Sequence, residues 1–347
     1  MMMPIIMNTS FERLAQIDEY ISFIWATRYY TSGEFELCVP VDENTTSIFQ
    51  KNFYVTRDDD DQVGIIEKIR IEKTADNQEM AIVSGRFLTS ILGRRIIAVQ
   101  TQVSGTVSSC IQALINQNAI SPSIAARQIP NLSFASEVTS SQTMQAQFTG
   151  DNLLDAISKI AQTYGIGIKA GITQNNEFEF TLFEGVNHSV AQSVNPCVIF
   201  SDAYDNLLSS EYEESYQNLV TDVLIAGEGE GLARKTLWVT KTAPSGLNRY
   251  EFFQDARDAS TNDGEISDEV YYNQLRGEAL ESITAFTTAF TGEVDFSNIV
   301  YKQDVNIGDI CTIKNKRWGL SINTRLVEII ESIGENGAYT ITPSFGI

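Results

Sequence analysis

Histidine and cysteine are scarce in this chain of 347 residues. His188 is the only histidine, and the four cysteines, at positions 38, 110, 197 and 311, are never closer than 72 positions apart. This spacing contains no CxxC pair and no zinc-ribbon or redox signature. A single histidine also excludes most triad and zinc chemistry. We therefore expect four reduced thiols that pack as small hydrophobic side chains.

Long apolar runs and basic leader segments are also lacking. No stretch reaches the roughly 18 apolar residues that a membrane helix needs. The first residues, MMMPIIMNTSFERLAQ, have neither the basic start nor the long apolar segment of a secretory signal. The sequence therefore predicts synthesis in the cytoplasm, no export by the usual route and no stable membrane insertion.

Basic charge is scarce as well: 24 Lys and Arg face 45 Asp and Glu, which gives a net charge of −21. A surface this acidic repels phosphate groups, which argues against specific nucleic-acid binding and against docking onto anionic lipid. The charge is uneven: residues 1–102 hold 10 basic and 15 acidic side chains, residues 103–192 hold 3 and 6, and residues 193–347 hold 11 and 24. The length suggests two or three folded units, and these differences mark three regions.

The first region alternates with period two. Phe35, Leu37 and Val39 point to one side of a predicted strand, while Glu34, Glu36 and Cys38 point to the other. Short strands at intervals of about ten residues predict a small antiparallel barrel or sandwich. Two further strands are predicted at 63–71 and 80–83, and two hairpin loops at 57–61 and 74–78. One or two helical turns are predicted at 87–95.

The middle region predicts two helices and a hairpin, an α/β unit inserted into the barrel. The second helix begins at Asp151 as N-cap and ends at Gly165. Strands at 166–172 and 177–185 join at residues 174–176. The buried faces of the two helices are predicted to be Val107, Ile111, Leu114 and Ile115, then Leu153, Leu154, Ile157, Ile160 and Ala161.

The third region returns to strands and carries one helix over 267–285. Ser267 and Val270 open this helix, and Glu269, Glu278 and Glu281 are expected on its solvent side. The predicted strands are 218–225, 235–240, 250–253, 289–296, 309–314, 323–332 and 338–342.

Two motifs invite a ligand-binding interpretation. GEGEG at 227–231 lacks the third glycine that GxGxxG needs at 232, and its two glutamates would face the anion, so an acidic turn between strands is favoured. Asp58–Asp61 suggests calcium, but an EF-hand register with Gly64 sixth puts Arg70 where a bidentate Glu is needed. An exposed acidic hairpin tip is the better interpretation, and weak cation binding there stays open.

Catalytic constellations are equally weak. The sequence has no Gly-x-Ser-x-Gly, and a cysteine nucleophile would have only His188 as its base. A glycosidase pair stays open among the many carboxylates, but none stands in an apolar pocket that would raise its pKa. We therefore predict no catalytic, cofactor-binding or metal-ligating residues. The carboxylates considered are Glu211, Glu213, Glu214, Asp255, Asp258, Asp263, Glu265 and Asp268.

A resemblance goes further than these patterns. Residues 21–40 read ISFIWATRYYTSGEFELCVP, in which an aromatic, Ser/Thr and Gly stretch precedes Phe-x-Leu. This resembles the opening of siphophage tail-tip (baseplate) hub proteins, the Gp37-like tail proteins. The resemblance runs from about residue 20 to residue 346. It continues in order through GIIEKIRIE (64–72), VSGRFLTSILGRRII (83–97), DNLLDAISKIAQTYGIGIKA (151–170), NLVTDVLIAGEGEGLAR (218–234), YKQDVNIGDICTIKN (301–315) and WGLSINTRLVEIIES (318–332).

The resemblance implies a mainly β (α+β) fold with two small β-barrel hub domains. The first barrel would comprise 1–103 plus 193–230, and an inserted α/β domain 104–192. The second barrel would comprise 231–347, with a helical insertion at about 260–292. It also implies a structural protein of the virion tail tip, related to the hubs of contractile tails and assembled in the bacterial host cytoplasm. Because the chain stops just after the last barrel, we expect no enzymatic activity and no cofactor.

The implied assembly is a homotrimer whose two barrels per chain give pseudo-sixfold symmetry. Such a ring would close the tail tube, adapt a sixfold tube to a threefold tip and let DNA pass through its lumen on ejection. The implied partners are the distal tail protein or tail tube protein, the tape measure protein, and a tail fibre, spike or receptor-binding protein. An acidic lining would let DNA slide without sticking.

Two alternatives stay open. One is the same hub in a contractile tail, tailocin or injection machine. The other is a tail-associated peptidoglycan hydrolase or endopeptidase, which purified protein would reveal by clearing cell walls.

Overall fold

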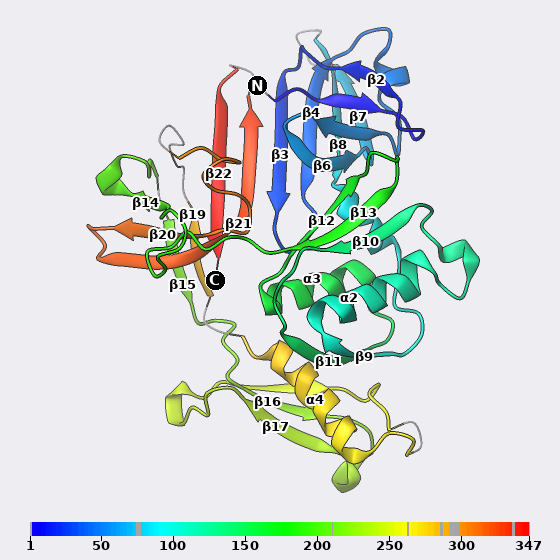
Figure 1. The fold of residues 1–347 in the computed structure, drawn as a ribbon, viewed down its shortest axis with the longest axis vertical. Helices are drawn as coiled ribbons and strands as arrows, with labels where there is room; N and C mark the ends of the chain where they lie inside the picture. Colours follow the sequence, from blue (N-terminus) through cyan, green and yellow to red (C-terminus); the bar gives the residue numbers. More distant parts are fainter. Residues whose placement is uncertain are drawn as a thin grey trace.

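The computed structural model describes residues 2–73, 78–209, 211–261, 264–284, 287–291, 294, 299–334 and 337–346. Strands account for 41% of the chain and helices for 20%, so the prediction of a mainly β fold is confirmed. Among the described residues, no helix is long and apolar enough to cross a membrane. A large sheet lies towards one end of the long axis, and a small sheet with one helix lies at the other (Figure 1).

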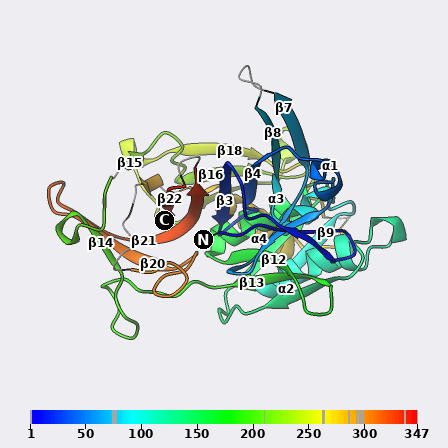
Figure 2. The same cartoon turned by 90° about the horizontal axis from the view of Figure 1, so that it is seen from above.

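The large sheet joins the first and last parts of the chain. Eight strands follow one antiparallel path, with β21 and β3 side by side at its centre (Figure 1 and Figure 2). Here Glu331 lies opposite Trp25, and Ile333 lies opposite Phe23. In path order the strands are β15 (Glu211–Ser215), β19 (Thr287–Thr291), β22 (Tyr339–Gly346), β21 (Leu320–Ile333), β3 (Ser22–Arg28), β4 (Glu34–Pro40), β8 (Glu79–Arg86) and β7 (Lys68–Lys73). Off this path, β20 (Ile310–Asn315) pairs with β21 and with β14 (Ile199–Ser201).

Each half of the path has its own hydrophobic core. Phe23, Trp25 and Leu37 are fully buried in the first half, and Leu326 and Phe345 are buried in the second. The alternation predicted for residues 34–39 is confirmed by the burial of its apolar side, although Cys38 is buried as well.

The described strands form open sheets and close no barrel, so the prediction of two small barrels is not confirmed. The physical reason is the pairing of β3 with β21, which joins the two regions edge to edge instead of closing each on itself. A separate sheet packs over the core of the first half, and a short helix, α1 (Thr45–Ile48), precedes two of its strands. The strand order of this separate sheet is β2 (Arg13–Gln16), β1 (Ile5–Met7), β5 (Tyr54–Arg57) and β6 (Asp60–Ile65).

The strand predicted at 63–71 is in fact two strands. The chain leaves the small sheet at the end of β6 and enters the large sheet at the start of β7. Gly85 makes this crossing possible, because a Cβ there would lie only 1.8 Å from the carbonyl oxygen of Ile65. The helical turns predicted at 87–95 are confirmed as a 3-10 helix over Leu88–Arg94. Most of the loop predicted at 74–78 lies outside the described residues.

The middle region forms the predicted helices and hairpin. The residues expected on the buried faces of α2 (Val107–Ile115) and α3 (Leu153–Tyr164) are all buried, and α3 ends at Gly165 with a φ of 70°. The N-cap prediction was wrong by one residue: the side chain of Asn152, not Asp151, accepts the N–H groups of Leu154 and Asp155. The strands are β9 (Thr101–Thr106) paired with β11 (Thr143–Phe148), and a sheet in the order β10 (Leu132–Ser136), β13 (Phe178–Phe183), β12 (Gly167–Ile172).

Short helical segments follow α2 in this region and recur later in the chain. A π-helix over Asn116–Ile120 continues α2, and 3-10 turns cover Ala125–Arg127, Asp202–Tyr204, Gly231–Ala233 and Gly246–Asn248 along the rest of the chain.

The third region contains a small module at the end of the molecule opposite the large sheet (Figure 1). Its strands are β17 (Thr236–Thr240), β16 (Asp222–Ala226) and β18 (Glu251–Asp255), and α4 (Asp268–Ser282) covers one face. The predicted start of this helix at Ser267 is confirmed, and the Ser267 side chain accepts the N–H of Val270 as the N-cap. The solvent-side prediction was right for Glu269 and wrong for Glu278 and Glu281, which lie against the middle region, where Lys159 pairs with Glu281 at 3.2 Å.

Candidate functional site

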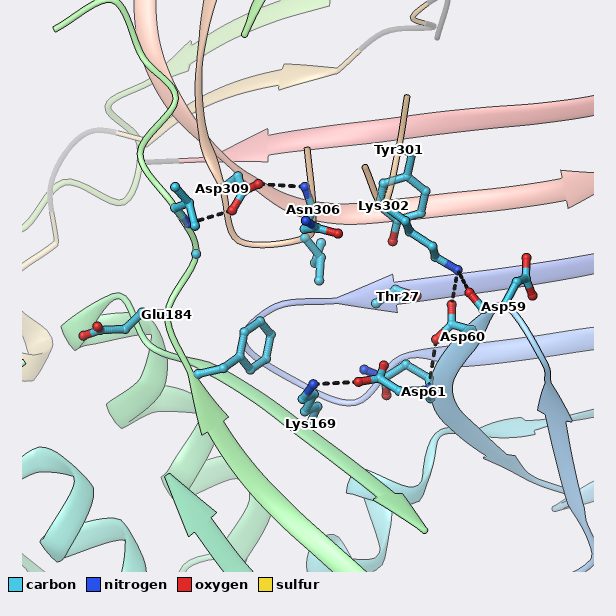
Figure 3. A pocket seen from close by; sticks show the side chains of 15 residues that line it. Thr27, Asp59, Asp60, Asp61, Lys169, Glu184, Tyr301, Lys302, Asn306 and Asp309 are labelled. Carbon is cyan, nitrogen blue, oxygen red and sulfur yellow. Dashed lines mark hydrogen bonds and ion pairs between the residues drawn. The ribbon is translucent and has the colours of Figure 1, made fainter. Parts of the chain in front are cut away.

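A pocket of about 380 Å³ lies where three parts of the chain converge. We call it the junction pocket (Figure 3). The β5–β6 turn forms one side, the end of the β12–β13 hairpin forms another, and the segment before β20 forms the third. Its lining comprises Thr27, Asp59, Asp60, Asp61, Gln62, Lys169, Phe183, Glu184, Gly185, Val186, Tyr301, Lys302, Asn306, Ile307 and Asp309.

A buried ion pair supports the pocket at the seam between the two halves of the large sheet. The side chains of Arg57 and Glu331 are 0% and 3% exposed, and both guanidinium N–H groups lie 3.0 Å from the carboxylate oxygens. Arg57 also binds Asp59 at 2.6 Å and lies over the ring of Trp25. A bidentate arginine–carboxylate pair has fixed geometry, so it holds the β5–β6 turn against β21.

Two lysines bind the same turn from the other parts of the chain. Lys302 donates to the Asp60 carboxylate at 2.7 Å and to the carbonyl oxygen of Asp59 at 2.9 Å. Lys169 on β12 donates to Asp61 at 2.6 Å. The turn therefore contacts the middle region and the C-terminal region at once.

The prediction of an exposed acidic tip holds for three of the four aspartates. The side chains of Asp58, Asp59 and Asp61 are 77%, 55% and 66% exposed, whereas that of Asp60 is only 5% exposed. Asp60 is buried because the segment carrying Lys302 folds over it, a contact between residues 242 positions apart. Local turn chemistry gives no signal of such a contact.

The surroundings shift the acidities of several lining groups. Burial raises the pKa of Asp60, although Lys302 acts in the opposite direction. Burial likewise raises the pKa of Asp309, against the hydrogen bonds that it accepts from the backbone N–H groups of Asn306 and Val186. Partial burial would raise the pKa of Asp59 too, but the hydrogen bond from Arg57 leaves it below the usual value. These carboxyl groups therefore occupy three distinct environments in one pocket.

Thr27 is the unusual polar group of the lining. It lies on β3, is 3% exposed, and its hydroxyl has no hydrogen-bond partner among the described residues. Buried hydroxyls are nearly always paired, so an unpaired one at a pocket wall points to a group that the protein itself does not supply.

Most residues singled out by the sequence lie away from this pocket; the exceptions are the Asp58–Asp61 turn and His188, whose Nε2 lies 3.6 Å from the Asp309 carboxylate. GEGEG is a turn as predicted, with positive φ at Gly229 and Gly231, and Glu228 accepts hydrogen bonds from Thr261 and pairs with Lys235. His188 binds the carbonyl oxygen of Pro196 through Nδ1 at 2.8 Å.

The cysteines and carboxylates are dispersed as well. Of the cysteines, only Cys197 is exposed. Glu211, Glu213 and Glu214 lie on β15 rather than in a loop, and Asp255 pairs with Arg234 and Arg257. Asp258, Glu265 and Asp268 are exposed, and Asp263 lies outside the described residues. Within the described ranges, no three His, Cys, Asp or Glu residues form a group that could hold a metal ion.

Sequence reasoning missed Arg57, Lys302, Glu331 and Thr27 as site residues. One signal was available in the sequence. Side chains alternate between the two faces of a strand, so Ile329, Glu331 and Ile333 lie on the same face, and a carboxylate stands there between two apolar side chains. A buried carboxylate needs a partner. The identity of that partner, 274 positions away, is not encoded locally.

The sequence matches one protein family over nearly its whole length. Residues 4–347 match the family model described as Siphovirus ReqiPepy6 Gp37-like protein. A search among curated proteins finds none that matches this sequence.

Three solved structures share the fold. The tail protein from Neisseria meningitidis MC58 is 12% identical with a TM-score of 0.62, over 100% of this chain and 96% of that one. The 43 kDa tail protein of prophage MuSo2 from Shewanella oneidensis is 14% identical with a TM-score of 0.59, over 99% and 98%. Prophage tail protein gp18 from Listeria monocytogenes EGD-e is 11% identical with a TM-score of 0.58, over 99% and 94%.

At these identities the likeness is one of fold, and it extends over nearly the full length of all three tail proteins. The family match covers almost the entire chain as well, so the protein belongs to the Siphovirus ReqiPepy6 Gp37-like family of phage tail proteins.

Proposed function

We propose that this protein is the structural hub of a phage tail tip, and that three copies form a ring that closes the tail tube and lets DNA pass on ejection. One observation carries the proposal: the eight-stranded path of the large sheet, which divides into two halves of four strands and, among the described residues, ends in the edge strands β15 and β7. The same architecture would adapt a sixfold tube to a threefold tip, because three copies would present six half-sheets.

The two halves support pseudo-sixfold symmetry. The strands β15, β19, β22 and β21 form one half and β3, β4, β8 and β7 form the other, so each half has four strands. Each half has its own core on the same side of the sheet. These halves are the units that we propose in place of two closed barrels. The division of the chain at residues 103, 192 and 230 stays a prediction.

The two open ends of the path are complementary in charge. β7 reads KIRIEK, with three basic side chains and one acidic, and β15 reads EYEES, with three acidic side chains. Neighbouring strands are antiparallel throughout the path, and β7 of one copy next to β15 of another would continue this alternation. A head-to-tail contact of this kind forms a closed ring when the rotation from one copy to the next brings the last copy back to the first.

The open face of the path supports a lining whose arginines are paired with carboxylates. Arg28 pairs with Glu34 at 2.6 Å and with Glu328 at 2.7 Å, and Arg86 pairs with Glu67 at 2.8 Å. This pairing leaves little free positive charge to hold phosphate, and the three carboxylates against two guanidinium groups leave a small negative excess. DNA would pass such a lining without being held, although with weaker repulsion than the net charge of −21 suggests.

The proposed location and partners follow from the ring. The protein would be assembled in the host cytoplasm into the virion tail tip, between the distal tail or tube protein on one side and a fibre, spike or receptor-binding protein on the other. The tape measure protein would end at its bore. The proposed role is structural, since the solved structures of the same fold are tail proteins.

The deciding experiment is the mass of the purified protein, with negative-stain imaging. One chain has a mass of 38.5 kDa, and we expect a species of three times that mass with a central hole. A monomer that stays monomeric when mixed with the purified distal tail or tube protein would contradict the proposal. Clearing of cell walls by the purified protein would instead favour the hydrolase alternative.

A further inference from the structure

We infer that the junction pocket binds a linear organic polyamine, in which primary ammonium groups are joined by an aliphatic chain. This inference goes beyond the hub role and does not depend on ring formation. It is carried by the charge of the lining, by the arrangement of its carboxylates and by the unpaired hydroxyl of Thr27.

The lining has an excess of negative charge. Its five carboxylates belong to Asp59, Asp60, Asp61, Glu184 and Asp309, and its two ammonium groups belong to Lys169 and Lys302, which leaves three negative charges in excess. Walls of low dielectric constant concentrate the potential of such a cluster inside the pocket and attract cations.

The carboxylates form two groups on opposite sides of the pocket. Figure 3 shows the Asp59–Asp61 turn on one side and Glu184 and Asp309 on the other, with Thr27 between them. A compact ion can contact only one group at a time, whereas a diamine has a cationic end for each. A volume of about 380 Å³ also exceeds what one metal ion fills.

The middle of the pocket suits the aliphatic part of such a ligand. The ring of Phe183 lines it and already accepts the ammonium group of Lys169 at 5.4 Å from its centroid. Aromatic faces attract ammonium groups and pack against methylene chains. The ligand would therefore bury its carbon chain against the ring and hold its charged ends towards the carboxylates.

Thr27 supplies the second, independent observation. Its hydroxyl is buried and unpaired among the described residues, and the residue is part of the pocket lining. An ammonium group has three donors and no acceptor, so it would donate to this oxygen. A polyamine would thereby satisfy a fully buried polar group that has no partner among the described residues.

The test is titration calorimetry of the full chain with spermidine at low ionic strength, using wild type, Thr27→Val and Asp61→Asn. We expect saturable binding with one site per chain. Thr27→Val should weaken it by about fivefold, the value of one hydrogen bond, and Asp61→Asn by about tenfold or more, because a charged partner is lost. Thr27→Val should not lower the unfolding temperature, since it removes an unpaired hydroxyl.

Glu265→Gln provides the matched control, because it makes the same change of charge at an exposed position of the distant module. It should leave spermidine affinity unchanged, and magnesium chloride at equal ionic strength should not displace spermidine. No saturable binding, or equal weakening by Asp61→Asn and Glu265→Gln, would overturn the inference. Either result would leave the proposal of a trimeric ring unaffected, because the mass of the protein is measured without the polyamine.

Discussion

At the scale of single residues, the most informative group is the buried pair of Arg57 and Glu331. Both side chains are almost fully excluded from water, yet Arg57 lies on β5 of the separate sheet and Glu331 lies on β21 of the large sheet. A desolvated ion pair contributes little net stability compared with apolar residues, but losing one partner is costly. The pair therefore fixes how the β5–β6 turn lies against β21 more than it adds to the free energy of folding.

We expect Glu331→Ala to destabilise the protein by about 3 kcal/mol, because it leaves the Arg57 guanidinium buried with Asp59 as its remaining partner. Urea unfolding followed by tryptophan fluorescence measures this change. The control is Glu79→Ala, which removes the partner of Lys73 in a pair whose side chains are about half exposed. That change should stay within about 0.5 kcal/mol. Equal effects would contradict the assigned role.

At the scale of elements, two neighbouring polar residues at the start of α3 have different roles. Asn152 accepts the free N–H groups of the first turn, whereas Asp151 accepts only the N–H of Thr149, outside the helix. We expect Asn152→Ala to cost about 1 kcal/mol and Asp151→Ala to cost less. Chemical denaturation of both variants measures the difference. A larger loss for Asp151→Ala would restore the N-cap predicted from the sequence.

The contact between α4 and the middle region is expected to depend on pH. Burial raises the pKa of Glu278 above its usual 4.5, against the hydrogen bond from Gln254, and Asp258 and Glu281 raise it further while Lys159 lowers it. The folded protein therefore binds more protons than the unfolded chain above about pH 4.5, so this part of the stability falls as pH rises through the shifted pKa.

We expect Glu278→Gln to flatten this part of the pH dependence and to leave stability near neutral pH at least as high as in wild type. The amide still accepts from Gln254, and no buried charge remains to be desolvated. Urea unfolding at a series of pH values between about 4.5 and 7 measures the slope. Glu269→Gln, on the exposed side of the same helix, is the control and should keep the wild-type slope.

At the scale of the whole molecule, three copies with a charge of −21 each repel one another, so a ring needs attractive contacts at defined places. The oppositely charged ends of the eight-stranded path provide such contacts.

Lys68→Glu with Arg70→Glu should shift the trimer to monomer, and Glu211→Lys with Glu213→Lys should do the same. One chain that carries all four changes should restore the trimer, because every contact between β7 and β15 again joins opposite charges. Mass photometry measures all three samples, and an unaffected trimer in either variant alone would exclude this contact.

The predictions from sequence succeeded where the signal was local. The alternation around Phe35 and Leu37 and the end of α3 at Gly165 each reflect neighbours a few positions apart, although the N-cap of the same helix was missed by one residue. They failed where distant segments meet. Glu278 and Glu281 were expected in solvent, because a helix pattern alone does not show that a second surface covers its polar side.

The sequence by itself determined the mainly β class, the helices of the middle region, the family and the strongly acidic surface, because composition, periodicity and motifs are properties of the chain. Only the tertiary structure decided that the first and last regions share one sheet, and that Asp60, Lys302 and Thr27 meet at one pocket. The reason is physical: strand pairing and buried charge pairs are chosen by complementarity between surfaces, which local sequence patterns do not specify.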